Sequence, residues 1–475
     1  MNNNTVYTLG MVFILALAGP AITARGQTAE ALIRKLVQKG ILTEQEAKDL
    51  AAESAETNEV HKLHPLKWTI NNAFKSITLF GDVRLRYEYR GAENAPGSGS
   101  SEDTYMRERF RYAVRIGIRG DLFDKFYYGL RLETSTNPRS TWVTFGDDSN
   151  PTPSAKNSDG INLGQAYIGW RPTDWYEMTV GRMPMPLYVT SMIWDGDINP
   201  EGAVEEFRYP VGPVGLFANF GQFLYQDTDP DLATPSSDTF LLGWQVGADA
   251  KLPKNTSVKV APVLYNYTGT GSKHGLNQPY TGEGLAGLNP NNAPAVNQNG
   301  INDLLVLEVP AQFNVKVGGY NARAFGDFAY NFYGQDRADA AFAATQGSSV
   351  ALPHPFTGEN MACQFGLGFG DFGHGRQGHT FKHTWDVRAY WQHIEQYAVD
   401  VNLIDSDLFE GRANLEGVAA GIQYGVTDSL IGTFTYAYAN RINEALGTGG
   451  NNPDLPILNP IRNYHLLQLD LTLRF

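Results

Sequence analysis

The sequence lacks several features that would place it in a class at once. A single cysteine, Cys363, excludes an intrachain disulfide framework. Beyond the N-terminus there is no long apolar run, and no block of Lys and Arg interrupts a net charge of -13, which argues against a nucleic-acid partner. The G-x-S-x-G, H-E-x-x-H and P-loop motifs are also missing. We therefore predict no catalytic residue, no cofactor and no metal.

Glycine and aromatic residues, by contrast, are abundant. The 475 residues include 50 Gly, 24 Tyr and 25 Phe, and only 18% are charged. The length permits several soluble domains or one large closed architecture. Glycine suits the turns of a large membrane barrel, and aromatic rings suit the two boundaries between lipid and water, so the composition favours the closed architecture.

The N-terminal region differs from the rest of the chain. Residues 1–26 combine a short apolar core with small residues near the end, which predicts a signal peptide, although no Lys or Arg precedes the core. In 27–60, Thr43 and Glu46 form a capping box, which predicts a short helical or coiled-coil segment in the periplasm. A solvated linker of modest helicity is the alternative.

From residue 74 onward, apolar and polar residues alternate in short stretches, as in β-strands. In 83–90, charged residues occupy every second position. That face must meet water, because a Lys or Arg at the bilayer midplane costs roughly 2 to 4 kcal/mol. We therefore predict that 74–475 is all-β and forms a transmembrane antiparallel up-and-down β-barrel around an aqueous lumen.

Short and long connections take turns along this region, which is typical of a membrane barrel with short periplasmic turns and long external loops. They delimit roughly 16 strands, an even number that returns both barrel ends to the periplasm. The tight connections are 120–125, 171–175, 210–213, 253–256, 318–320, 371–378 and 426–429. The long ones are 91–104, 135–160, 185–201, 227–239, 269–302, 334–360, 395–413 and 442–462.

The last twelve residues, 464–475, alternate from Leu466 onward. One face carries the polar residues, including Asp470 and Arg474, and the other carries Leu467, Leu469, Leu471, Leu473 and Phe475. A strand of a soluble sandwich can alternate in the same way. A strand that ends in Phe, however, resembles the closing strand of bacterial outer-membrane barrels, which serves as their insertion signal. We expect this strand to close the barrel against the first one and to engage the barrel-assembly machinery.

Several segments in a fixed order resemble the putative porin family of Gram-negative outer membranes. They are the helical opening LIRKLVQKGILTEQEAKDL, the strand pair GDVRLRYEYR and RERFRYAVRIGIRGDL, GRMPMP at 181–186, WDGDINPEG at 194–202, the stretch 405–442 and the closing LLQLDLTLRF. The resemblance implies a pore in the cell outer membrane through which small hydrophilic solutes or ions diffuse passively, with the N-terminal segment in the periplasm and lipid around the barrel.

Charged residues are concentrated on the first three predicted strands, where they predict a pore-lining constriction. Arginines facing carboxylates create a transverse field across a pore, as general porins do by resemblance. The alternative is that the arginines only pair with neighbouring acids and stiffen the wall. The arginines are Arg84, Arg86, Arg107, Arg109, Arg111, Arg115 and Arg131, and the candidate carboxylates are Asp82, Glu88 and Glu133 on the wall with Asp195, Asp197 and Glu201 in a loop that, by analogy, folds inward.

Two further clusters carry weaker signals. Asp405, Asp407 and Glu410 offer oxygen ligands without the spacing of a known calcium loop, so we interpret them as part of a solvated external loop. The nearby histidines fit a flexible turn better than a metal site. They are His374, His379 and His383.

Two other functions compete with a pore. One is a structural or adhesive barrel that tethers the envelope without conducting. The other is an outer-membrane lipid hydrolase, but no adjacent Ser and His in the sequence support it. Whether the chain forms a homo-oligomer stays open, because a helical N-terminal segment is compatible with either a trimer or a monomer.

Overall fold

The computed structural model describes the barrel unit, Asn72–Phe475, in most of its length. Besides Gln38, the described residues are 73–94, 104–134, 140–146, 160–227, 238–269, 304–346, 352–371, 382–448 and 461–475. The predicted signal peptide at 1–26 and, apart from Gln38, the predicted helical segment at 27–60 lie outside them.

The unit is built from antiparallel strands that form one sheet. The strands are β1 (Thr78–Asn94), β2 (Thr104–Asp121), β3 (Phe126–Thr134), β4 (Val143–Thr144), β5 (Ile161–Trp170), β6 (Tyr176–Arg182), β7 (Glu201–Val211), β8 (Val214–Gln226), β9 (Thr239–Leu252), β10 (Thr256–Val260), β11 (Val263–Thr268), β12 (Leu305–Glu308), β13 (Ala311–Val317), β14 (Tyr320–Asn331), β15 (Met361–Gly370), β16 (Trp385–Ile394), β17 (Leu415–Gly425), β18 (Leu430–Arg441) and β19 (Ile461–Arg474). A 3-10 turn, η1 (Phe123–Lys125), follows β2, and a helix, α3 (Gly334–Thr345), follows β14.

Three strands of the barrel are interrupted, so that the described segments make 16 strands around it. Both β3 and β4 pair with β2, both β10 and β11 with β9, and both β12 and β13 with β14. Pro262 and Pro310 stand at the second and third interruptions, because proline has no N–H to donate to a ladder. Their carbonyls still accept bonds, from Val246 N at 3.1 Å and Ala261 N at 3.1 Å. The predicted count of roughly 16 is confirmed.

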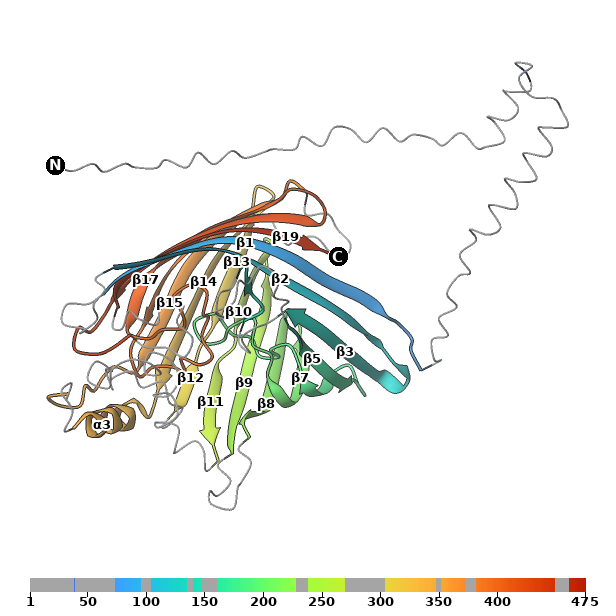
Figure 1. Cartoon of the computed structure of the whole chain (residues 1–475). Helices are drawn as coiled ribbons and strands as arrows, with labels where there is room; N and C mark the ends of the chain where they lie inside the picture. Colours follow the sequence, from blue (N-terminus) through green and yellow to red (C-terminus); the bar gives the residue numbers. More distant parts are fainter. Residues whose placement is uncertain are drawn as a thin grey trace. The chain divides into compact units, whose positions relative to one another are not determined.

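The barrel closes where its last strand meets its first, β19 against β1 (Figure 1). Phe475 N donates to Gly81 O at 3.1 Å, and Gly81 N donates to Phe475 O at 3.0 Å. A Cβ atom at Gly81 would lie 2.3 Å from the carbonyl oxygen of Arg115 and 2.8 Å from the Phe475 ring, so only glycine fits beneath that ring. The C-terminal alternation therefore builds the seam of the barrel, as predicted.

The outer face of the wall is apolar along its strands. Phe110, Val246 and Leu367 are 55%, 56% and 57% exposed, respectively, whereas their neighbours in sequence face inward. Aromatic rings gather near the short turns, for example Tyr320 with Trp385 at a centroid distance of 5.4 Å. An apolar band bordered by aromatic rings is the surface that a membrane barrel presents to lipid.

No helix in the part of the chain that the structure describes is both long and apolar enough to cross a membrane.

The predicted connections fall between the observed strands, with one added helix and one major correction. The connection predicted at 371–378 is longer, because β15 ends at Gly370 and β16 begins at Trp385, and 372–381 lie outside the described residues. The stretch 334–360 contains α3, whose Ala338 and Ala341 pack against Tyr397 and Leu446. The correction concerns 395–413, which was predicted to be a solvated external loop: its Glu410 has no exposed surface, and Arg412 donates to that carboxylate at 3.0 Å. A loop with so little contact with water must pack inside the barrel.

Candidate functional site

Two connections fold into the barrel and meet there. We call 183–200, between β6 and β7, the first inward loop, and 395–414, between β16 and β17, the second inward loop. Leu187 and Met192 of the first loop pack in one buried cluster with Leu241 of β9. Leu241 is 1% exposed, whereas its neighbour Phe240 is 41% exposed on the outer face, so the loop contacts the inner side of the wall.

The two inward loops are hydrogen-bonded to each other. Asp195 N donates to Leu403 O at 2.5 Å, and Asp405 N donates to Ser191 O at 3.0 Å. The backbone N and the hydroxyl of Ser406 both donate to Asp195 Oδ2, at 3.2 and 3.0 Å. The two inward loops therefore form one connected layer within the lumen, which we call the loop layer.

The layer is attached to the wall at β9, β12 and β14 through the first loop. Thr190 N donates to Glu308 Oε1 at 3.2 Å, and its hydroxyl donates to Asp327. Tyr188 N donates to Gln245 Oε1 at 2.9 Å. Because Tyr188 and Thr190 bind three different strands, this side of the layer is held at several points.

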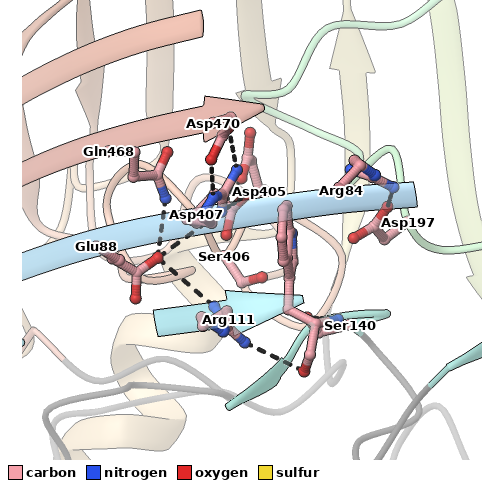
Figure 2. Close-up of polar contacts among 12 residues, drawn as sticks. Arg84, Glu88, Arg111, Ser140, Asp197, Asp405, Ser406, Asp407, Gln468 and Asp470 are labelled. Atoms are coloured by element: carbon pink, nitrogen blue, oxygen red, sulfur yellow. Dashed lines mark hydrogen bonds and ion pairs between the residues drawn. The ribbon is translucent and has the colours of Figure 1, made fainter. Parts of the chain in front are cut away.

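On the β1 and β2 side, Glu88 lies at the centre of the arginine cluster (Figure 2). Its Oε1 accepts from Arg109 Nε at 2.6 Å and from Arg90 Nε at 3.0 Å, and its Oε2 lies 3.5 Å from Arg111 Nη1. Gln468 of β19 donates to Oε2 at 3.0 Å. Glu88 has no exposed surface, so these partners replace water around a fully buried charge.

Arg86 connects three parts of the molecule. Its Nε and Nη2 bind the two oxygens of Asp470 on β19 at 2.6 and 2.9 Å, the forked geometry that suits a guanidinium. Its Nη1 donates to Asp407 of the second inward loop at 2.8 Å. The Trp142 ring lies 4.0 Å from its Cζ, within the range of a cation-π contact.

Arg84 and Arg115 bind the first inward loop in a similar way. Asp82 accepts from Arg84 Nε at 2.9 Å and from Arg115 Nη2 at 2.9 Å. Asp197 lies 3.8 Å from Arg84 Nη2 and 3.5 Å from Arg115 Nη1. The first inward loop thus reaches the arginine wall through Asp197, as drawn in Figure 2.

The remaining residues of the predicted constriction are less central. Arg131 is paired with Glu133 at 2.6 Å, and Arg107 faces Arg90 across the ladder of β1 and β2. Glu201 lies apart from the cluster: it is paired with Arg182 at 2.8 Å. The Arg182 and Glu201 pair shares the outer face with the pair Val180 and Ala203, two positions along the ladder.

The loop carboxyl groups are held in different charge states by their surroundings. Burial and the negative charge of Asp197 raise the pKa of Asp195 to about 6. Burial, together with Asp195 and Asp407, raises the pKa of Asp405 well above its usual value. Burial would also raise the pKa of Asp407, but the nearby Arg86 and Arg90 hold it below the usual value. The arginine wall therefore stabilises the charge of Asp407.

Sequence reasoning missed three parts of this network. Arg90 shares the face of Arg84 and Arg86, so its period-two position could have revealed it. Glu410, read as external, is held by Arg412 and lies 3.5 Å from Arg90 Nη1. Trp142 lies in a long connection without periodicity, so no local pattern signals its place above the arginines.

No metal site emerges among the described residues, where no group of three or more His, Cys, Asp or Glu is arranged to hold an ion. His374 and His379 lie outside the described ranges. His383 lies near the Tyr424 hydroxyl, with Nδ1 2.9 Å from the oxygen.

Comparison with known proteins adds a family. Residues 91–326 match the family described as "Putative porin". No curated protein matches the chain. The family match agrees with a porin rather than an enzyme, and the missing catalytic motifs predict the same.

Solved structures with similar folds include three bacterial porins. An anion-selective porin from Comamonas acidovorans is 11% identical, with 84% of this chain and 99% of that chain covered and a TM-score of 0.42. An OmpF of Salmonella typhi in complex with daunomycin is 9% identical, with 86% and 99% covered and a TM-score of 0.45. A mutant of the Rh. blastica porin is 13% identical, with 84% and 100% covered and a TM-score of 0.38. At these identities and scores, nothing about what those proteins conduct or bind follows for this chain.

Proposed function

We propose, since residues 91–326 match the putative porin family, that the barrel conducts small hydrophilic solutes or ions passively across the cell outer membrane. The observation that carries the proposal is a closed wall of 16 strands whose outer face is apolar and whose inner face is lined with paired charges and polar groups. A barrel of this size is too wide for its own side chains to fill, so its lumen holds water unless a domain plugs it.

We propose that the two inward loops narrow the path. They contact each other and reach both the arginine wall and the wall of β9, β12 and β14. We propose that the arginines between Arg84 and Arg115 chiefly hold this layer in place, because their charges are satisfied by wall and loop carboxylates. Their direct influence on a permeating ion is then weaker than their number alone implies.

The test of the pore is conductance in a planar bilayer. Purified, folded protein should insert in steps, each adding a constant ohmic conductance. Protein that inserts and never conducts would exclude a pore.

A non-conducting structural barrel is the second candidate, and one observation favours it. The inward loops are bonded to each other as well as to both walls, and a layer so attached could also block the lumen. Deleting residues 187–194 of the first loop separates the two functions: a pore gains conductance from an already measurable level, whereas a blocked barrel changes from none to a measurable one.

On this proposal, each part of the chain has a role in reaching the outer membrane. Residues 1–26 would direct secretion, 27–60 would remain in the periplasm, and 74–475 would insert as the barrel. The strand ending in Phe475 would engage the assembly machinery. Removing Phe475 should reduce insertion into the outer membrane far more than it alters conduction by inserted molecules.

A further inference from the structure

A second set of lumen arginines, on β14 and β16, differs from the β1 and β2 cluster in its exposure to solvent. It carries a more specific inference, which rests on the proposed function. The central arginines of the β1 and β2 cluster are paired with carboxylates and nearly inaccessible to solvent; they are Arg86, Arg90, Arg109 and Arg111. A permeating ion responds to charges that it can approach without desolvating a buried pair. The exposed lumen charges therefore act most strongly on a permeating ion.

Arg323 on β14 and Arg388 on β16 meet that condition. The ladders align both with Gly368 of β15, which lies between them. The side chain of Arg323 is 32% exposed, compared with 6% for Arg86 and 1% for Arg90. Arg388 is exposed too, and it forms no ion pair with any residue that the structure describes.

Gly368 makes room for this arrangement. A Cβ atom there would lie 2.4 Å from Arg323 Nε, so the arginine side chain lies across the glycine. Arg323 is paired with Asp386 of β16. Two guanidinium groups and one paired carboxylate thus occupy this part of the wall, which leaves it with a net positive charge.

The position relative to the inward loops gives these arginines access to the solute path. Asp327, which holds Thr190 of the first loop, follows Arg323 on the same face of β14. Tyr390 follows Arg388 on β16 and packs in a buried cluster with Leu408 and Phe409 of the second loop. Arg323 and Arg388 therefore adjoin the loop layer on its short-turn side.

We propose that Arg323 and Arg388 form an anion-binding step at the exit of the loop layer and make the pore prefer small anions. A guanidinium stays charged at any physiological pH, and its planar fork binds carboxylate or phosphate oxygens through two donors. The exposed Arg388 beside the partly exposed Arg323 attracts anions electrostatically and repels cations at the same point.

The experiment measures reversal potential in a KCl gradient for wild-type protein and for the variant Arg323→Ser/Arg388→Ser. The chloride-to-potassium permeability ratio should fall by about threefold or more in the double variant. Arg388→Lys should retain most of the preference, because it keeps the charge. Arg182→Ser, which removes one positive charge on the outer face, is the matched control and should leave the ratio unchanged.

A second measurement avoids dependence on folding of the serine variants. Arg388→Cys in a Cys363→Ser background, inserted in the bilayer, is modified with a negatively or a positively charged thiol reagent. The negative adduct should lower the permeability ratio and the positive one restore it.

The outcomes separate this inference from the proposed function. Wild-type protein that conducts, with the same ratio in the double variant and in both adducts, overturns the anion-binding step alone. Wild-type protein that inserts without conducting overturns the pore and the step together.

Discussion

Two groups of arginines on the lumen wall differ in what surrounds them. Around Glu88, the guanidinium groups are buried and shared among carboxylates of the wall and of the second inward loop. Beside Gly368, Arg323 is partly exposed and Arg388 is exposed. The first arrangement stabilises structure, since breaking a buried pair leaves an uncompensated charge, and the second is available to solutes. Charge of one sign on a pore wall therefore has two different uses, which burial distinguishes.

The largest expected effect comes from removing the central carboxylate of the buried group. Glu88→Gln leaves Arg90, Arg109 and Arg111 without their common partner, so the free energy of unfolding from lipid vesicles should fall by about 3 to 5 kcal/mol. Glu201→Gln, which breaks the exposed pair with Arg182, is the control and should cost at most about 1 kcal/mol. Equal losses in the two variants would contradict the contrast between buried and exposed pairs.

The next effect is a pH dependence of the contact between the loops. The folded-state pKa of Asp195, about 6, exceeds its usual value of 3.8, so the folded protein binds this proton more tightly than the unfolded chain. The associated stability is fully present below pH 3.8 and is lost as the pH rises through 6. Raising the pKa of Asp195 from 3.8 to about 6 corresponds to about 3 kcal/mol of stability.

Urea unfolding in vesicles at pH 4 and pH 7 measures this dependence. Wild-type protein should lose stability across the interval relative to Asp195→Asn, in which the side chain stays neutral. If both proteins change in parallel, the titration belongs to another group.

A smaller effect is expected when the geometry of Arg86 is changed but its charge is kept. Arg86→Lys cannot bind both oxygens of Asp470 and reach Asp407 at the same time, and it stacks less well on Trp142. The free energy of unfolding should fall by about 1 to 2 kcal/mol, and the open-channel current should become noisier as the second inward loop loosens. Arg131→Lys, at a pair confined to β3, serves as the control for noise. Quiet currents in Arg86→Lys would show that the loop is held by other contacts.

The smallest effect sharpens the comparison from the other side. Replacing Arg107, Arg109 and Arg111 by Ser removes three charges, two of them buried against Glu88. Among molecules that still insert, the chloride-to-potassium permeability ratio should change by less than about twofold, because Glu88 neutralises the charges of Arg109 and Arg111. If this ratio changes more than it does in Arg323→Ser/Arg388→Ser, then the cluster of β1 and β2 determines selectivity.

Particular residues show which features the sequence predicts and which it does not. The alternation around Arg84 and Arg86 correctly predicts an inward face, and the terminal Phe475 correctly predicts the closing strand. Pro262 and Pro310 explain interruptions that alternation alone does not reveal. The sequence wrongly predicts an external loop at Asp405 and Asp407. A long polar connection has the same local pattern whether its side chains contact water or an arginine wall.

The sequence by itself determined which face of each strand meets water and how the connections divide the chain, because both depend on residues next to each other in the chain. Tertiary structure alone decided that two long connections turn inward and that Arg86 joins Asp407 and Asp470, residues 321 and 384 positions away. It also decided that Arg388 remains exposed. Pairing across such separations depends on which strands the closed barrel brings together, and no local pattern records that choice.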